Sequence, residues 1–151
     1  MTVVTRNLPD QANRIIAMTA HDRSLLVEAG AGSGKTAIMA GRVAMMLVAG
    51  IRPRHIAAVT FTELAASELL ARVRQFVDEL LAGRIPVELA SVIHGELDSQ
   101  QKTNLDRAGQ EIDEITCSTI HGFCQRLIKP YPAEANIDPG ASVADRNDAD
   151  F

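Results

Sequence analysis

The chain has 151 residues, of which 46% are apolar, and its 15 basic and 19 acidic side chains give a net charge of −4. The length fits one globular domain, and the acidic balance argues against a nucleic-acid binder that works through a large positive field. No apolar run is long enough to span a membrane and the N-terminus lacks a secretory signal, so the expected address is the cytoplasm. Cys117 and Cys124 are the only cysteines, and we expect them to be reduced and buried there.

A helix and a short strand are expected first. Pro9 falls where the first turn of a helix tolerates a missing N–H, and Ile15 and Ile16 give that helix an apolar side before it ends near His21. Residues 24–28 then carry three consecutive apolar side chains. This pattern predicts a buried strand of a parallel sheet.

A glycine-rich loop follows the expected strand. Its residues are Ala29, Gly30, Ala31, Gly32, Ser33, Gly34, Lys35 and Thr36. Glycines let the backbone wrap a triphosphate, so that N–H groups and a helix N-terminus face the negative charge. In such a loop Lys35 supplies a mobile cation for the outer phosphates, and the Thr36 hydroxyl is a ligand for Mg²⁺. Ala29 stands where the strict pattern has its first glycine, but a simple turn would not need the Lys-Thr pair.

The remaining pattern alternates helices and strands, as an α/β domain with a parallel sheet requires. The expected helices cover residues 36–49, 62–81 and 119–129, and the expected strands cover residues 56–61 and 115–118. Thr62 is placed to cap its helix, with Glu63 complementing the helix dipole. We therefore expect the strand at residues 24–28, the helix at residues 36–49 and the strand at residues 56–61 to form a right-handed βαβ unit.

Two segments carry no recognisable chemistry. Residues 95–114 are polar except for a narrow stripe of Leu105, Ala108 and Ile112, so we expect a surface helix that looks like an insertion. Residues 131–151 are rich in Pro, Ala, Asp and Asn and show no period. We interpret them as an unfinished tail that leads to a next subdomain.

Four patches occur in a fixed order along the chain. They are Leu8-Pro9-Asp10-Gln11, the loop of residues 29–36, Val59-Thr60-Phe61-Thr62-Glu63-Leu64-Ala65-Ala66, and Ser118-Thr119-Ile120-His121-Gly122-Phe123-Cys124. Together they resemble the N-terminal motor domain of the superfamily 1 DNA helicases of the UvrD, Rep, RecB and AddA group. A phosphate loop alone would leave many ATPase families open, whereas the second pair of patches is specific to this group. The long spacer between those two patches favours the RecB and AddA branch.

The resemblance implies that residues 1–130 form an incomplete RecA-like domain, a P-loop NTPase fold of three layers with a parallel sheet. It implies a part of an ATP-dependent DNA helicase or translocase in which Gln11 reads the adenine and residues 29–36 hold the triphosphate of ATP. Thr36 would ligate Mg²⁺ through the bound nucleotide. The side-chain amide of Gln11 suits the recognition of adenine, since an amide pairs with both the donor and the acceptor edges of this base.

The resemblance also implies that Phe61, Thr62 and His121 lie near the path of single-stranded DNA. Aromatic and imidazole faces can stack on bases without a strongly positive surface. The implied partners are single-stranded DNA or DNA with a single-stranded end, the remaining helicase domains of the same chain, and a partner subunit.

The chain departs from the family pattern in two respects. Ala37 stands where related helicases often have a basic residue that helps to hold the nucleotide. The acidic pair that would hold Mg²⁺ and orient water is not found, because Asp113 and Glu114 precede an expected strand instead of ending one. We therefore expect a fragment of a longer enzyme, which by itself binds nucleotide weakly and hydrolyses little.

Three other interpretations remain open at this point. A P-loop kinase of a small metabolite would need a lid with catalytic arginines, which the sequence does not suggest. A nucleotide-gated binding module would bind without hydrolysis. Cys117, His121 and Cys124 could also converge on a metal, although a fourth ligand is missing.

Overall fold

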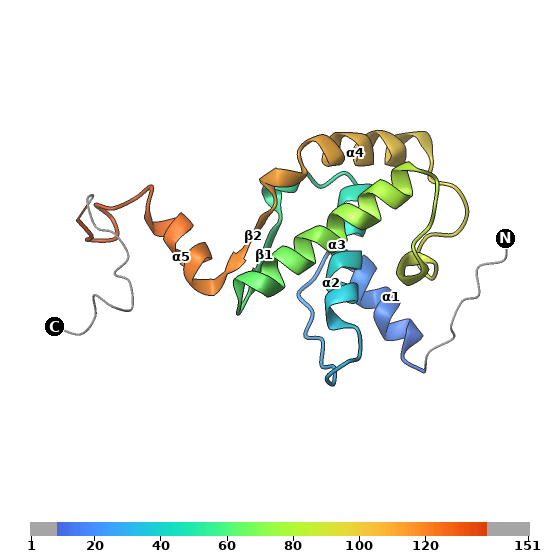
Figure 1. The fold of residues 1–151 in the computed structure, drawn as a ribbon, viewed down its shortest axis with the longest axis horizontal. Helices are drawn as coiled ribbons and strands as arrows, with labels where there is room; N and C mark the ends of the chain where they lie inside the picture. The colour runs from blue at the N-terminus through green and yellow to red at the C-terminus, as the bar shows by residue number, and fades with distance from the viewer. Residues whose placement is uncertain (1–8, 139–151) are drawn as a thin grey trace.

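The computed structural model describes residues 9–138, and within them a small parallel sheet lies at one side of a group of helices (Figure 1). The helices are α1 (Gln11–Thr19), α2 (Lys35–Val48), α3 (Glu63–Leu81), α4 (Ser99–Gln110) and α5 (Ile120–Ile128). The strands are β1 (Ala57–Thr60) and β2 (Thr116–Thr119), and short 3-10 turns cover Pro53–His55, Val87–Leu89 and Ile112–Glu114. The α/β class with a parallel sheet is therefore confirmed.

The two strands pair in parallel, and their register runs from Ala57 opposite Thr116 to Thr60 opposite Thr119. The helix α3 lies in the crossover between them and contacts both strands. Because the register is aligned over all four pairs, both strands end at the same edge of the sheet. The segments that follow them start side by side, which positions the site described below.

The core lies where α2 and α3 pack against each other, with α1 and α4 covering α2 (Figure 1). This arrangement explains why α2 is apolar on nearly all sides. The largest fully buried side chains are Phe76, Leu47, Leu89, Leu105, Val73, Val77 and Pro53. Between residues 9 and 138, no helix combines the length and the apolar content that crossing a bilayer requires.

Residues 24–28 do not form a strand, so this prediction was wrong. The segment belongs to neither a helix nor a strand, and its backbone makes no hydrogen bond with any other described residue. Leu26 is 89% exposed, and Leu25 and Val27 also reach the surface. A run of apolar residues becomes a strand only when a neighbouring strand pairs with its backbone, and none of the described strands does so.

The expected surface helix within residues 95–114 is confirmed as α4. Asp98 caps it through a reciprocal pair of hydrogen bonds with Gln101, and Leu105, Ala108 and Ile112 form the buried stripe. The interpretation of this segment as an insertion stays a prediction.

Asn104 connects α4 to the end of α2. Its Nδ2 donates to the carbonyl of Val48 at 3.0 Å, and its Oδ1 accepts from Gln100 Nε2 at 3.0 Å. Val48 is the last residue of α2, so this carbonyl has no partner within the helix. Gly50, with a φ of 92°, passes so close that an added Cβ would lie 3.0 Å from Asn104 Nδ2. The amide and the glycine together fix the turn after α2.

We expect Asn104→Ala to lower the free energy of unfolding by about 1–3 kcal/mol, because the buried Val48 carbonyl loses its donor. Urea denaturation measures this change. Gln100→Ala is the matched control, since it removes only the outer hydrogen bond and should have a smaller effect. Equal stability of Asn104→Ala and the wild type would contradict this role.

A bidentate ion pair links the turn before β1 to the segment before β2. Arg52 Nε and Nη2 donate to Glu111 at 3.1 Å and 2.5 Å. The hydrogen bonds from Arg52 hold the pKa of Glu111 below its ordinary value of 4.5. The pair thus ties together the two connections that lead into the paired strands.

We expect this ion pair to make stability dependent on pH. Because the pKa of Glu111 is lowered on folding, its contribution is complete above pH 4.5 and is lost as the pH falls through the folded value. Thermal melts of Glu111→Gln and the wild type should therefore differ at neutral pH and converge in acid. Glu96→Gln, which changes a carboxylate that is 95% exposed, should show no such trend. A constant difference at all pH values would rule out the ion pair as its cause.

Candidate nucleotide and nucleic-acid site

The glycine loop leads directly into the N-terminus of α2. Gly32 and Gly34 have φ values of 72° and 86°, a region that other residues adopt only with strain. Gly34 is the N-cap of α2 and offers no side chain to its first N–H groups. Those donors and the positive end of the helix dipole are thus available to an anion held by the loop.

Lys35 and Thr36 begin α2, and both side chains are exposed. Lys35 Nζ donates to the carbonyls of Ala29 at 2.9 Å and Gly30 at 2.6 Å, so its ammonium lies across the loop. Thr36 borders an open cleft between α2 and α3 whose other lining residues are Glu68, Ala71, Arg72 and Gln75. The polar side of α3 was expected from the sequence, but its position beside Thr36 was not.

The arginines of α3 are engaged with acidic side chains. Arg72 Nη2 lies 3.2 Å from Glu88 Oε1, and its guanidinium is 6.0 Å from the centre of the Phe76 ring. Arg74 is paired with Asp113. Asp113 therefore serves in an ion pair on the surface of the described chain.

Gln11 is the first residue of α1, and its half-buried side chain makes no hydrogen bond with another described residue. One turn further along, Arg14 reaches the loop. Its Nη2 donates to the carbonyl of Ser33 at 3.0 Å, while Asp10 accepts from the same guanidinium at 2.9 Å. The hydrogen bond from Arg14 lowers the pKa of Asp10. Arg14 was not predicted as a site residue, although the spacing of Asp10 and Arg14 is that of an ion pair within a helix.

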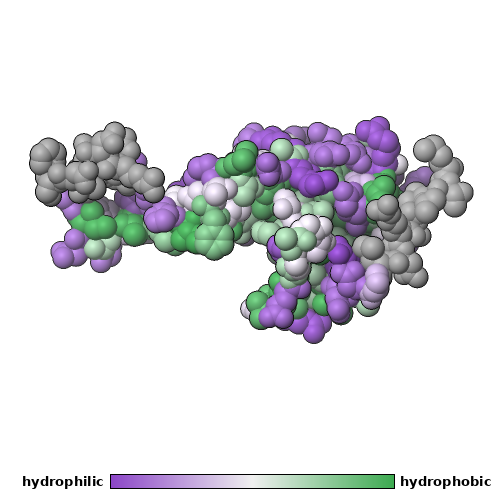
Figure 2. Space-filling model, turned by 60° about the horizontal axis from the view of Figure 1, so that its bottom comes forward, coloured by the Kyte–Doolittle hydropathy of each residue, from purple (hydrophilic) through white to green (hydrophobic). Residues whose placement is uncertain are grey.

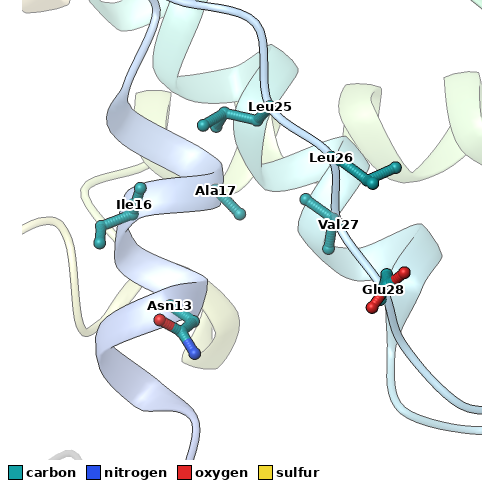
Figure 3. A pocket seen from close by; sticks show the side chains of 7 residues that line it. All are labelled: Asn13, Ile16, Ala17, Leu25, Leu26, Val27 and Glu28. Carbon is teal, nitrogen blue, oxygen red and sulfur yellow. The ribbon is translucent and has the colours of Figure 1, made fainter.

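A shallow cleft separates α1 from residues 24–28 (Figure 3). Ile16 and Ala17 line it from the helix, and Leu25, Leu26 and Val27 line it from the segment that leads to the loop. Asn13 and Glu28 stand at its polar end. The apolar residues that predicted a strand thus form part of an open surface beside the loop.

Phe61, Thr62 and His121 follow the carboxyl ends of the two strands. Phe61 is 91% exposed, and Thr62 caps α3 by accepting a hydrogen bond from Ala65 N at 3.1 Å. His121 is the exposed second residue of α5. Since Thr60 pairs with Thr119, the turn at Phe61 and the start of α5 lie at one sheet edge. The structure thus brings these three residues to a common edge of the sheet.

Apolar surface surrounds this edge. Leu64 is 68% exposed, Ile120 45% and Val59 37%, and α5 has no buried residue. Figure 2 shows hydrophobic surface in the region between the two strands and α5. Exposed side chains of this kind suit contact with flat apolar faces such as bases.

The cysteine region does not form a metal centre. Cys117 Sγ donates to the carbonyl of Ala66 at 3.0 Å, and burial raises the pKa of this thiol. Cys124 is exposed, and both thiols are free. Within residues 9–138, no group of three His, Cys, Asp or Glu side chains could hold a metal ion.

The described residues thus define an α/β protein with a parallel sheet, a glycine loop at a helix N-terminus and a second exposed edge beyond the strands. The sequence profile of the UvrD/REP helicase N-terminal domain matches residues 10–150. The chain therefore belongs to the UvrD/REP helicase N-terminal domain family.

The chain is also similar to proteins whose shared name describes one subunit of an ATP-dependent helicase/nuclease. The relative from Desulforamulus reducens is 32% identical over 93% of this chain, and the one from Heliobacterium modesticaldum is 33% identical over 87%. The relative from Desulfitobacterium hafniense is 36% identical over 84% of the chain. The matched residues make up 10%, 8% and 8% of these three relatives, so the chain spans about a tenth of their length.

Proposed function

We propose that this chain forms the ATP-binding part of an ATP-dependent DNA helicase or translocase. In this proposal, residues 29–36 hold the triphosphate, Lys35 contacts its outer phosphates, and the Thr36 hydroxyl ligates Mg²⁺ that arrives with the nucleotide. Gln11 reads the adenine. The main support for this proposal is the loop itself. Two of its glycines have left-handed backbone conformations, and the loop leads directly into a helix N-terminus that has no side-chain cap and begins with Lys35 and Thr36.

We also propose that the sheet edge at Phe61, Thr62 and His121 contacts single-stranded DNA, or DNA with a single-stranded end. The exposed phenyl ring, the neighbouring apolar surface and the parallel register that joins the two turns support this role. Bases can stack on exposed aromatic side chains without a strongly positive surface, so a DNA partner is compatible with the net charge of −4. The name that the relatives share, which describes a helicase/nuclease built from subunits, supports both a DNA substrate and a partner protein.

In this account residues 1–130 are part of a RecA-like P-loop domain with three layers. Residues 95–114 are an insertion, and residues 131–151 lead toward a next subdomain, although 139–151 lie outside the described residues. Hydrolysis would require groups from further domains of the same protein, which would act in the cytoplasm. The chain alone would bind nucleotide weakly and hydrolyse little.

The test is ATP turnover by the full-length protein with and without single-stranded DNA. The proposal predicts stimulation by DNA. Turnover that depends on a small metabolite would instead indicate a kinase. Nucleotide binding without turnover under any condition would indicate a binding module, and both results would contradict the proposal.

A further inference from the structure

Arg14 connects the helix α1 to the proposed phosphate loop by a hydrogen bond. The other hydrogen bonds of the loop are local, such as Ser33 Oγ to the carbonyl of Gly30 at 2.8 Å and Lys35 Nζ to Ala29 and Gly30. Arg14 Nη2 instead reaches the Ser33 carbonyl from another helix, at 3.0 Å. Within the described residues, it is the one hydrogen bond that joins the loop to an element other than α2.

The guanidinium is held in a fixed orientation. Asp10 Oδ1 accepts a hydrogen bond from Arg14 Nε at 2.9 Å, and Asp10 Oδ2 forms an ion pair with Nη2 at 2.9 Å, so the carboxylate orients the group that donates to the loop. The side chain of Arg14 is only 18% exposed. Its Nη1 would lie 3.6 Å from a Cβ added at Gly34, which places the group against the last turn before α2.

Arg14 also shares a helix face with the proposed base reader. Residues three apart on a helix are neighbours, so Gln11 and Arg14 lie on adjacent turns of α1. Because Asp10 neutralises the guanidinium, Arg14 contributes little free positive charge to the loop. Its effect is therefore geometric, through the link between α1 and Ser33.

We propose that Arg14 is a positioning residue of the nucleotide site, which fixes the separation between the adenine-reading Gln11 and the phosphate loop. This inference rests on the proposed function. It makes base recognition, and not phosphate binding, the property that depends on Arg14. The link restrains a glycine-rich loop that would otherwise be free to move relative to α1.

The experiment measures equilibrium binding of ATP, GTP and tripolyphosphate to the full-length protein. We expect Arg14→Ala to weaken ATP binding about tenfold and to narrow the preference for ATP over GTP by a similar factor. Tripolyphosphate should bind as before. Arg14→Lys should behave like Arg14→Ala, because an ammonium cannot bridge Asp10 and Ser33 in the same fork. Arg23→Ala, which removes an arginine that is 65% exposed, is the control.

A double-mutant cycle with Gln11→Ala provides the second measurement. If Arg14 acts through Gln11, adding Arg14→Ala to the Gln11→Ala protein should weaken ATP binding little further. Equal losses for ATP and tripolyphosphate would overturn the inference, since Arg14 would then be a direct phosphate ligand. Unchanged nucleotide binding in Arg14→Ala would also overturn it. A wild-type protein that binds no ATP would instead refute the proposed function.

Discussion

Lys35→Ala is expected to reduce DNA-stimulated ATP turnover by about a hundredfold or more, because in the proposed site Lys35 is the cation that contacts the outer phosphates. The fold should persist, since the side chain is exposed and bonds only to the carbonyls of Ala29 and Gly30. Steady-state turnover of the full-length protein, together with its circular dichroism spectrum, measures both effects.

Lys102→Ala is the matched control for this variant. Lys102 lies on α4, is 57% exposed and has only a loose ion pair with Glu96 at 3.8 Å. Its removal should leave turnover unchanged. If Lys35→Ala turned over ATP at the wild-type rate, the assignment of residues 29–36 as the triphosphate site would fail.

Phe76→Ala should destabilise the domain by about 3–5 kcal/mol, which is the usual result of deleting a fully buried aromatic ring. Phe76 is 1% exposed and belongs to the buried cluster that also contains side chains of α2 and Leu89. The ring also supports Arg72, which borders the cleft beside Thr36. Chemical denaturation followed by circular dichroism gives the free energy of unfolding.

Phe61→Ala is the matched comparison, because it removes the same ring from a side chain that is 91% exposed. We expect its effect on stability to stay within about 0.5 kcal/mol. Affinity for single-stranded DNA should instead fall by about 1–3 kcal/mol, the usual worth of one base stacked on an aromatic ring. A large loss of stability in Phe61→Ala, or a negligible one in Phe76→Ala, would show that the core is assigned incorrectly.

Local patterns predicted most of the helices because their signals act over a few residues. Thr62 was expected to cap a helix, and its hydroxyl accepts a hydrogen bond from Ala65 N. The stripe of Leu105, Ala108 and Ile112 was expected to be buried on a polar helix, and it is. Helix bounds shifted by a residue or two, as fraying ends allow.

Nonlocal contacts limited the prediction elsewhere. Residues 24–28 have the composition of a buried strand, but strand pairing depends on a partner that composition does not specify. The strand expected at residues 115–118 forms at Thr116–Thr119, where its register is set by β1. Arg14 contacts Ser33, which is 19 residues away, so no local pattern revealed its link to the loop.

The site could be predicted only where its residues are close together in the sequence. The loop of residues 29–36 is contiguous in sequence, so its glycines and its Lys-Thr pair form a pattern that the sequence alone reveals. Phe61 and His121 are 60 residues apart, and only the parallel pairing of β1 and β2 brings their turns to one edge. Their contact with DNA stays a proposal.

In the proposed function, ATP bound at the loop of residues 29–36 drives movement along DNA. The most direct measurement is ATP-dependent translocation of the full-length protein on single-stranded DNA, followed by displacement of streptavidin from a biotinylated end. We predict displacement with ATP and Mg²⁺, and none in Lys35→Ala or without nucleotide. Displacement that proceeds equally well without ATP, or in Lys35→Ala, would contradict the account.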